Sequence, residues 1–155
     1  MPSLMANSPA ADGLPGPDTP PVLDIGFDAG TLRRLRAKVC ACAVRAGFAG
    51  GHVEEVVLAV HELAANTVRH GGGAGRLRLW NLARALHGQV DDGDLRAAAG
   101  PRGEMGQAYL NALPFEPGHG LWVARQIADR IQALSGPAGT SVTIRFDCRS
   151  PAESW

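Results

Sequence analysis

The 155-residue chain is 45% hydrophobic and 19% charged, and its 15 Lys and Arg residues balance its 15 Asp and Glu residues. A nucleic-acid-binding protein usually carries a basic excess or a basic stripe, so this balance argues against direct DNA or RNA binding. No window approaches about 18 consecutive apolar residues, and the N-terminus lacks the basic start and apolar run of a signal peptide. We therefore expect one soluble, cytoplasmic domain that does not enter a membrane.

The first segment of the chain, residues 1–21, is rich in Pro, Ala, Ser and Gly and carries almost no periodic apolar signal. Such a composition predicts a disordered leader. The alternating apolar residues of 23–27 then predict a strand with one buried face. This strand opens a single domain that we place at residues 22–148, and residues 149–155 are expected to fray.

Two amphipathic helices are predicted next. Asp28 suits the N-cap of the first helix, apolar residues recur at helical spacing over 32–46, and Gly47 suits its end. The second helix is predicted over residues 52–69, again from apolar residues at helical spacing. The dense glycines of 71–75 cannot hold a helix and predict a loop.

The second half of the chain predicts two strands, a long loop, one more helix and a final strand. Residues 76–80 and 85–90 are typical of adjacent antiparallel strands. Residues 91–117 are rich in Gly, Ala and Pro, and a loop of that length inside a compact domain is commonly functional or mobile. Helical spacing predicts a helix over 121–134, and the alternation of 141–147 predicts the last strand.

This order of elements predicts an α/β two-layer sandwich, with helices packed on one face of a mixed, mainly antiparallel sheet. The two commonest phosphate-binding loops are missing, since the chain has neither Gly-x-x-x-x-Gly-Lys-Ser/Thr nor Gly-x-Gly-x-x-Gly after a strand. Its three cysteines are an odd number without metal-ligand spacing. Three other signals indicate the chemistry.

The first signal is the pair Glu62 and Asn66 in the segment ELAAN of the second predicted helix. The i,i+4 spacing places both side chains on one helix face, offset from the apolar stripe. An Asn carbonyl is a hard oxygen ligand suited to Mg²⁺. A carboxylate one turn earlier can hold or deprotonate a hydroxyl aimed at a phosphate. The alternative interpretation is a solvated pair on a helix surface.

The second signal is Asp91-Asp92-Gly93, where a predicted strand ends. A carboxylate there can accept a hydrogen bond from the exocyclic amine of adenine, and Gly allows close backbone approach to the base; a polar turn is the alternative. The third signal is the segment GHGL at 118–121, which opens the third predicted helix. Backbone N–H groups at a helix start suit a phosphate, whereas a flexible hinge is the alternative.

In chain order these signals are a helix with Glu and Asn, a strand ending in Asp-x-Gly, a long loop, Gly-x-Gly-Leu entering a helix, and Gly139-Thr140 entering a strand. This pattern resembles the GHKL nucleotide-binding superfamily, which includes gyrase and the histidine kinases. More closely, residues 59–71 (AVHELAANTVRHG) and 118–131 (GHGLWVARQIADRI) are similar to the anti-sigma-factor serine kinases of bacteria, particularly the actinobacterial ones. The resemblance covers about residues 32–146.

The resemblance implies a site for ATP and Mg²⁺. Asn66 would coordinate the Mg²⁺ that bridges the phosphates, Glu62 would act as the general base on the acceptor serine, and Asp91 would bind the adenine amine. Residues 94–117 would form the ATP lid. The other nucleotide contacts would come from Gly93 beneath the base, from Gly118, Gly120 and Leu121 at the phosphates, and from Thr140 near the adenine.

The chain departs from the family pattern in the lid region. Leu95 stands where a second glycine is frequent, and only Arg96 and Arg102 are basic. Fewer cations are then available to meet the γ-phosphate. Both departures argue against fast phosphoryl transfer more than they argue against nucleotide binding.

The function implied by the resemblance is an ATP-binding regulator that phosphorylates a serine or threonine on an antagonist protein of the anti-anti-sigma type and binds a sigma factor. The alternative is a non-catalytic module that uses the nucleotide to order a protein-binding surface, and a phosphotransfer assay separates the two. A mechanical ATPase of the gyrase or chaperone type would need a second, transducer domain, which the length disfavours. A homodimer is compatible with the first two functions.

Overall fold

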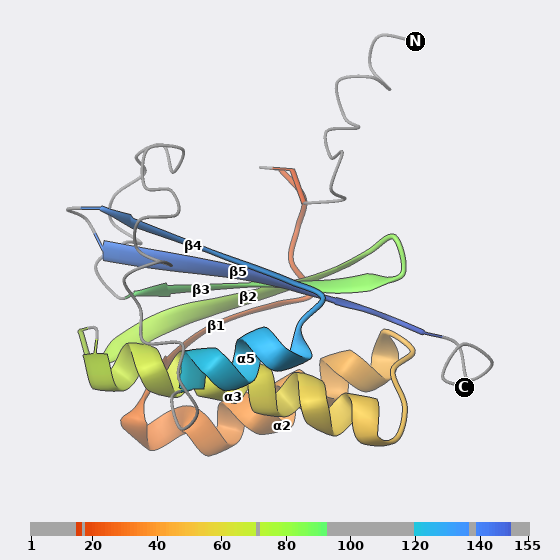
Figure 1. Cartoon of the computed structure of the whole chain (residues 1–155), viewed down its shortest axis with the longest axis horizontal. Helices are drawn as coiled ribbons and strands as arrows, with labels where there is room; N and C mark the ends of the chain where they lie inside the picture. Colours follow the sequence, from red (N-terminus) through yellow and green to blue (C-terminus); the bar gives the residue numbers. More distant parts are fainter. Residues whose placement is uncertain (1–14, 17, 71, 93–119, 137–138, 150–155) are drawn as a thin grey trace, which may run out of the picture.

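The computed structural model describes residues 15–16, 18–70, 72–92, 120–136 and 139–149. Its elements are, in order, β1 (Leu23–Asp28), the 3-10 turn η2 (Ala29–Thr31), α2 (Leu32–Arg45), α3 (Gly51–His70), β2 (Ala74–Leu82), β3 (Ala85–Asp92), α5 (Gly120–Ile127), β4 (Arg130–Gly136) and β5 (Gly139–Asp147). Figure 1 shows α2, α3 and α5 together on one face of the sheet. This arrangement confirms the predicted α/β two-layer sandwich.

The strands form one five-stranded sheet in the order β1-β2-β3-β5-β4. Every neighbouring pair in this described sheet is antiparallel. β2 and β3 form a hairpin whose two turn residues, Ala83 and Arg84, have φ of 51° and 61°. A two-residue turn with positive φ at both positions has a backbone twist that matches the right-handed twist of the flanking strands. The predicted strands at 76–80 and 85–90 are confirmed, and each is slightly longer.

The hydrophobic core lies between the sheet and the helices. Because side chains alternate along a strand, one face of each strand supplies apolar residues to it. The sheet contributes Leu77 and Leu79 from β2, Leu86 and Val90 from β3, and Val142, Ile144 and Phe146 from β5. On the helix side, Ala59 and Ala64 of α3 are fully buried, and their small side chains let α3 lie close to its neighbours.

The two helices predicted after β1 are confirmed as α2 and α3. Asp28 caps the short η2 turn that precedes α2: its Oδ1 accepts from the Gly30 N–H at 2.9 Å, and the Asp28 N–H donates to Thr31 Oγ1 at 2.9 Å. This reciprocal capping begins the helical segment one turn before α2 itself. Gly47 follows α2 with φ of 102°, a backbone conformation that ends helices and favours glycine.

The helix predicted over residues 121–134 is wrong in its second half. α5 ends at Ile127, and residues 130–136 form the edge strand β4, which pairs with β5. Ile131 and Ala133 stand two apart and pack on the core side of this strand. Short apolar segments often match both a helical period and a period of two. Here the available partner strand β5 decided between them, because sheet pairing overrides local propensity.

Part of the segment expected to be a leader contacts the sheet. The Trp80 indole N–H donates to the Thr19 carbonyl at 2.9 Å, and the Val22 N–H donates to the Leu79 carbonyl at 2.7 Å. Residues 1–14, 17 and 150–155 of the expected leader and tail lie outside the described residues. Among the helices that the structure describes, none is long and apolar enough to cross a membrane.

The glycine-rich loop predicted over 71–75 is shorter than expected, because Ala74 and Gly75 already belong to β2. Gly75 pairs with Phe27 of β1 on one side and with Asp92 of β3 on the other. A Cβ atom on Gly75 would lie 2.5 Å from Phe27 Cζ and 2.6 Å from the Asp91 carbonyl oxygen. Close packing within the sheet, and not a turn, therefore requires glycine at this position.

We expect Gly75→Ala to lower the free energy of unfolding by about 1–3 kcal/mol, since the buried Phe27 ring and the β3 backbone would both have to move. Urea unfolding followed by circular dichroism measures the change. Gly51→Ala is the matched control, because a Cβ atom there meets nothing within 4 Å. The control should leave the free energy of unfolding unchanged or raise it slightly. Equal destabilisation by the two substitutions would contradict the packing argument.

Candidate functional site

A cavity of about 100 Å³ lies beside the C-terminal part of α3 and the adjoining ends of β3 and β5. The residues that line it are Asn66, Thr67 and His70 from α3, Val90 and Asp92 from β3, and Thr140 and Val142 from β5. The two valines stand opposite each other in the β3–β5 pairing. The cavity thus combines an apolar surface with convergent polar side chains, as small-molecule sites do.

The predicted pair Glu62 and Asn66 lies on α3, and both side chains are half-buried. Leu63, which is 2% exposed, docks the helix on the core and leaves the two polar residues at the core's edge. Asn66 lines the cavity, whereas Glu62 lies one turn earlier and outside its lining. Beside Asn66, the Thr67 hydroxyl donates to the Leu63 carbonyl at 3.1 Å.

The structure places Asp91 and Asp92 on opposite faces of the sheet, because successive side chains of a strand point to opposite sides. Val90 and Asp92 face the helices and line the cavity. Asp91 points to the outer face, and it is not among the residues that line the cavity. The carboxylate at the cavity is therefore that of Asp92, and the expectation that Asp91 meets the base is corrected, because Asp91 lies on the other face of the strand.

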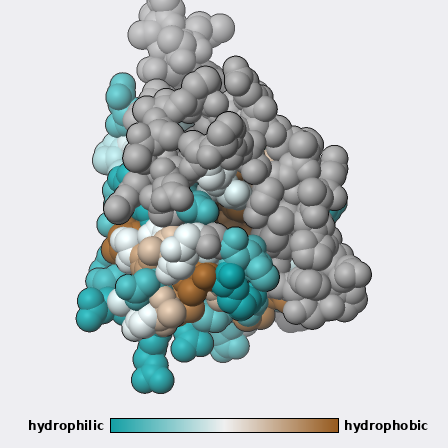
Figure 2. Space-filling view, turned by 90° about the vertical axis from the view of Figure 1, so that its left-hand side faces the viewer, coloured by the Kyte–Doolittle hydropathy of each residue, from teal (hydrophilic) through white to brown (hydrophobic). Residues whose placement is uncertain are grey.

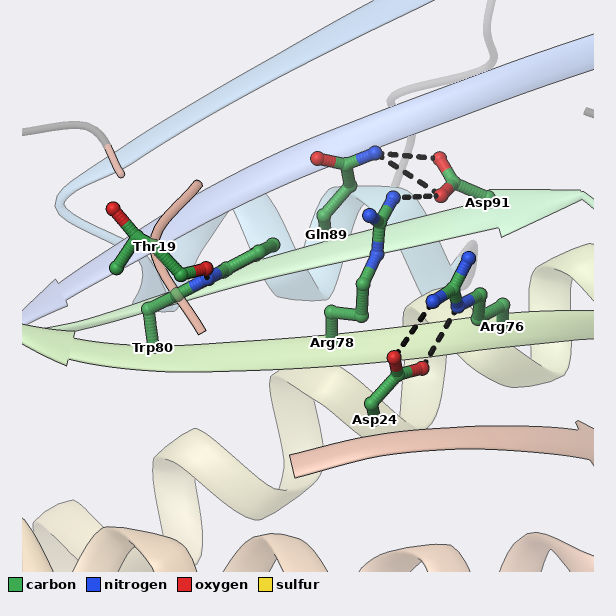
Figure 3. A network of polar contacts seen from close by, with 7 residues as sticks. All are labelled: Thr19, Asp24, Arg76, Arg78, Trp80, Gln89 and Asp91. Atoms are coloured by element: carbon green, nitrogen blue, oxygen red, sulfur yellow. Dashed lines mark hydrogen bonds and ion pairs between the residues drawn. The ribbon is translucent and has the colours of Figure 1, made fainter. Parts of the chain in front are cut away.

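Asp91 belongs to a polar network on the outer face (Figure 3). Arg78 Nη2 donates to Asp91 Oδ2 at 2.7 Å, and Gln89 Nε2 donates to both carboxylate oxygens at 2.9 and 3.0 Å. The Asp91 side chain is 4% exposed. A buried carboxylate needs such partners, because an unpaired buried charge is strongly destabilising. Asp91 therefore has a structural role, joining β2 to β3.

Asp92 and His70 are two of the five lining residues that were not predicted as site residues. For Asp92 the signal was present: Leu86 and Val90 are the apolar residues of this strand, and Asp92 continues their every-second-residue pattern onto the same face. His70 is exposed at the last position of α3 and lines the cavity.

The remaining predicted site residues divide into three groups. Thr140, near the start of β5, lines the cavity. Gly120 and Leu121 are the first two residues of α5, which packs against α3 (Figure 1). Gly93, Gly118 and the expected lid, residues 94–117, lie outside the described residues.

Comparison with models of protein families identifies the family of this chain. The histidine kinase-like ATPase domain family matches residues 26–146, a span that includes α3, the cavity and most of the sheet. The chain belongs to this family. Domains of the histidine kinase-like ATPase family bind ATP, usually together with Mg²⁺. No curated protein matches the chain.

Two solved structures are similar to the chain. The RsbU and RsbW domains of Rv1364c from Mycobacterium tuberculosis match with a TM-score of 0.58 and 19% sequence identity, over 83% of this chain and 32% of that chain. This chain therefore spans about a third of that structure's length. The catalytic domain of the histidine kinase ThkA matches with a TM-score of 0.44 and 13% identity, over 81% of this chain and 97% of that chain.

The residues at the cavity of this histidine kinase-like ATPase domain fit an ATP and Mg²⁺ site. Asn66 supplies an amide oxygen and Asp92 a carboxylate, both suited to a hard cation or to an amine donor. Within the described residues, no group of three or more His, Cys, Asp or Glu side chains could hold a metal ion alone. A magnesium ion here would therefore take most of its ligands from phosphate oxygens and water, as Mg²⁺ commonly does.

We expect Asp92→Asn to weaken adenine nucleotides about tenfold and guanine nucleotides much less, because a carboxylate accepts a hydrogen bond from the adenine 6-amino group, where guanine carries a carbonyl. Competition of ATP and GTP against a fluorescent nucleotide measures this selectivity. Asp91→Asn is the matched control: it should lower the free energy of unfolding by about 1–3 kcal/mol and leave selectivity unchanged. Loss of selectivity in the Asp91 variant alone would refute the assignment of the two faces.

Proposed function

We propose that this protein is an ATP-binding regulator of the anti-sigma type, which transfers the γ-phosphoryl group of ATP to a serine or threonine of an antagonist protein and binds a sigma factor. The observation that carries this proposal is one cavity that joins Asn66 of α3, Asp92 of β3 and Thr140 of β5. These residues come from three motifs that are far apart in the sequence. Their convergence supports a nucleotide site within a histidine kinase-like ATPase domain.

Within this site, Asn66 is the proposed protein ligand of the Mg²⁺ ion. Its half-buried position on a docked helix limits the motion of its side chain, which favours a fixed ligand geometry. Asp92 is proposed to accept a hydrogen bond from the adenine amine, and Thr140 to lie near the base. Mg²⁺ neutralises phosphate charge when it is bound, which is its contribution to phosphoryl transfer.

Glu62 is the proposed general base. It lies one helical turn before Asn66, just outside the cavity lining, where an acceptor hydroxyl from another protein could reach it. In the transfer, the acceptor oxygen forms a bond to the γ-phosphorus while the bond from that phosphorus to the β–γ bridging oxygen breaks. ADP leaves, and Glu62 takes the hydroxyl proton.

The proposed partners follow from the motif resemblance of residues 59–71 and 118–131 to anti-sigma-factor serine kinases. A structure containing RsbU and RsbW domains has a similar fold, which is compatible with this assignment. The formal net charge of zero also fits a protein whose partners are proteins and not nucleic acid.

One observation favours a second function, a non-catalytic module in which ATP orders a protein-binding surface. Glu62 does not line the cavity that Asn66, Asp92 and Thr140 share. A module that only binds nucleotide needs those three residues and no base. Phosphotransfer to the purified antagonist distinguishes the two functions, since only the kinase labels it.

We expect Asn66→Ala to abolish Mg-dependent ATP binding, because the metal would lose its protein ligand. Isothermal titration with Mg-ATP, compared with ATP in the presence of a chelator, measures the metal-dependent part of the affinity. Asn81→Ala, an exposed asparagine on β2, is the matched control and should bind like the unaltered protein. Equal Mg-ATP affinity of the Asn66 variant and the unaltered protein would rule out the proposed metal ligand.

Glu62→Gln should retain ATP affinity and lose transfer by about 10²- to 10⁴-fold, because the amide keeps the shape of the side chain and removes its basicity. Radiolabelled transfer from ATP to the antagonist provides the rate, and titration provides the affinity. Glu55→Gln, an exposed glutamate on the same helix, is the control and should transfer normally. An undiminished rate in the Glu62 variant would eliminate it as the base, whereas an unaltered protein that binds ATP and transfers nothing would support the non-catalytic module.

A further inference from the structure

A second cavity, of about 140 Å³, lies on the outer face of the sheet, opposite the helices. The strand register places two rows of side chains there. Trp80, His87, Arg145 and Arg130 are successive partners across β2, β3, β5 and β4, and beside them Gln89, Thr143 and Gln132 are successive partners across β3, β5 and β4. All seven residues line the cavity, and Pro15 from the N-terminal segment also borders it.

His87 at the centre of the first row is a buried polar group without a well-aligned partner. The residue is 3% exposed, and neither Nδ1 nor Nε2 makes a well-aligned hydrogen bond in the described structure, although the Leu82 carbonyl lies close enough to favour the protonated ring. Leaving a buried donor or acceptor unpaired is unfavourable, so such a group in a native protein commonly contacts a ligand or a water molecule. His87 therefore presents a hydrogen-bonding group to the cavity.

Burial lowers the pKa of His87 below its usual value, and the nearby Arg145 guanidinium acts in the same direction. The Leu82 carbonyl and the Asp147 carboxylate act in the opposite direction and do not reverse the shift. His87 is therefore neutral at pH 7, with one ring nitrogen a donor and the other an acceptor.

The charge at this cavity favours an anion. Two guanidinium groups, Arg130 and Arg145, belong to the lining, and no Asp or Glu is among the described residues that line it. Arg145 Nε lies 3.0 Å from Asp147 Oδ1, but its N–H is not aligned for a hydrogen bond with that carboxylate. The ion pair therefore leaves Arg145 able to direct an N–H toward a second anion.

The other end of the cavity is aromatic. The Trp80 indole N–H donates to the Thr19 carbonyl at 2.9 Å (Figure 3). The Arg78 guanidinium lies 5.6 Å from the centroid of the Trp80 ring. These two contacts hold the ring in place. Because neighbouring strands are about 4.8 Å apart, the backbones of Trp80 and Arg145 are separated by about 10 Å across the sheet. A cavity of about 150 Å³ is known to accept benzene, which is close to the volume here.

We propose that this outer-face cavity binds a small aromatic carboxylate. The ring of the ligand packs beside Trp80, the carboxylate meets Arg145 and Arg130, and His87 donates a hydrogen bond to the carboxylate from between them. The site lies on the opposite side of the sheet from Asn66 and Asp92, so this proposal is independent of the nucleotide site. Figure 2, which views the molecule from the side, shows hydrophilic and apolar residues mixed on the described surface.

Benzoate is the test ligand, and nitrogen NMR of the His87 imidazole is the direct readout. We expect benzoate to shift the His87 nitrogen signals in a saturable manner, together with the indole signal of Trp80. Benzamide has the same shape without the charge, and acetate has the charge without the ring, so each should bind at least about tenfold more weakly. His87 signals that do not move with benzoate, or that move equally with benzamide, would overturn the proposal and indicate that water alone serves this histidine.

Arg130→Gln tests the charge, and it should be tolerated because Arg130 is exposed on an edge strand. We expect it to weaken benzoate about tenfold. Arg33→Gln, an equal loss of charge on the exposed side of α2, is the matched control and should change nothing. Equal benzoate affinity of these two variants would show that the ligand responds only to net charge and would overturn the site.

His87→Phe tests the buried imidazole and assigns its NMR signals. This substitution removes a polar group without a well-aligned partner and keeps the ring, so we expect the midpoint of urea unfolding to stay the same or rise while benzoate affinity is lost. A folded Phe variant that binds benzoate as tightly as the unaltered protein would overturn the role of His87. If that variant does not fold, His87→Gln provides the assignment, and the Arg130 and Arg33 comparison decides the proposal.

Discussion

The alternation of side chains along β3 is the constraint on which the rest of this protein depends. β3 is the central strand of the sheet, and its residues from 85 to 91 are all buried. A slip of one residue would move Leu86 and Val90 to the outer face and bring Gln89 and Asp91 into the apolar core. The core, the candidate nucleotide cavity and the outer face are therefore determined together by a single register.

Polar contacts on the outer face reinforce that register. Arg78 stands opposite Gln89 in the β2–β3 pairing, and both donate to the buried carboxylate of Asp91. Removing one partner of such a buried group is strongly destabilising, so a shifted pairing is disfavoured by charge as well as by hydrophobic burial. The Arg76–Asp24 pair is 37% and 38% exposed and contributes much less, because solvent screens it.

The sheet separates two kinds of chemistry. On the helix side, Asn66 and Asp92 bring oxygen ligands to a cavity that suits a nucleotide and its metal. On the outer side, Arg130, Arg145 and a neutral His87 surround a cavity that suits an organic anion. His87 and Asp92 belong to the same strand, β3, so any displacement of this strand would change both cavities at once.

Much of the fold was predictable because its signals are local. Capping at Asp28, the helical spacing of α2 and α3 and the alternation of β5 depend on residues within one element, and the structure confirms each of these features. The layer arrangement followed from the order of those elements. Thr140 lines the cavity, although nothing in its immediate neighbours distinguishes it from any other strand threonine.

Three features were decided only by the tertiary structure. Residues 130–136 match a helix as well as a strand, and the free edge of β5 made them β4. Gly75 resembles a loop glycine in sequence, but the Phe27 ring and the β3 backbone leave no room for a side chain. Asp91 and Asp92 are adjacent carboxylates, and the spacing from Leu86 and Val90 indicates which of them faces the core, but only the tertiary structure brings α3 and β5 beside Asp92 to form the cavity. Each of these outcomes depends on a partner distant in the chain, and contacts of that kind leave no local pattern in the sequence.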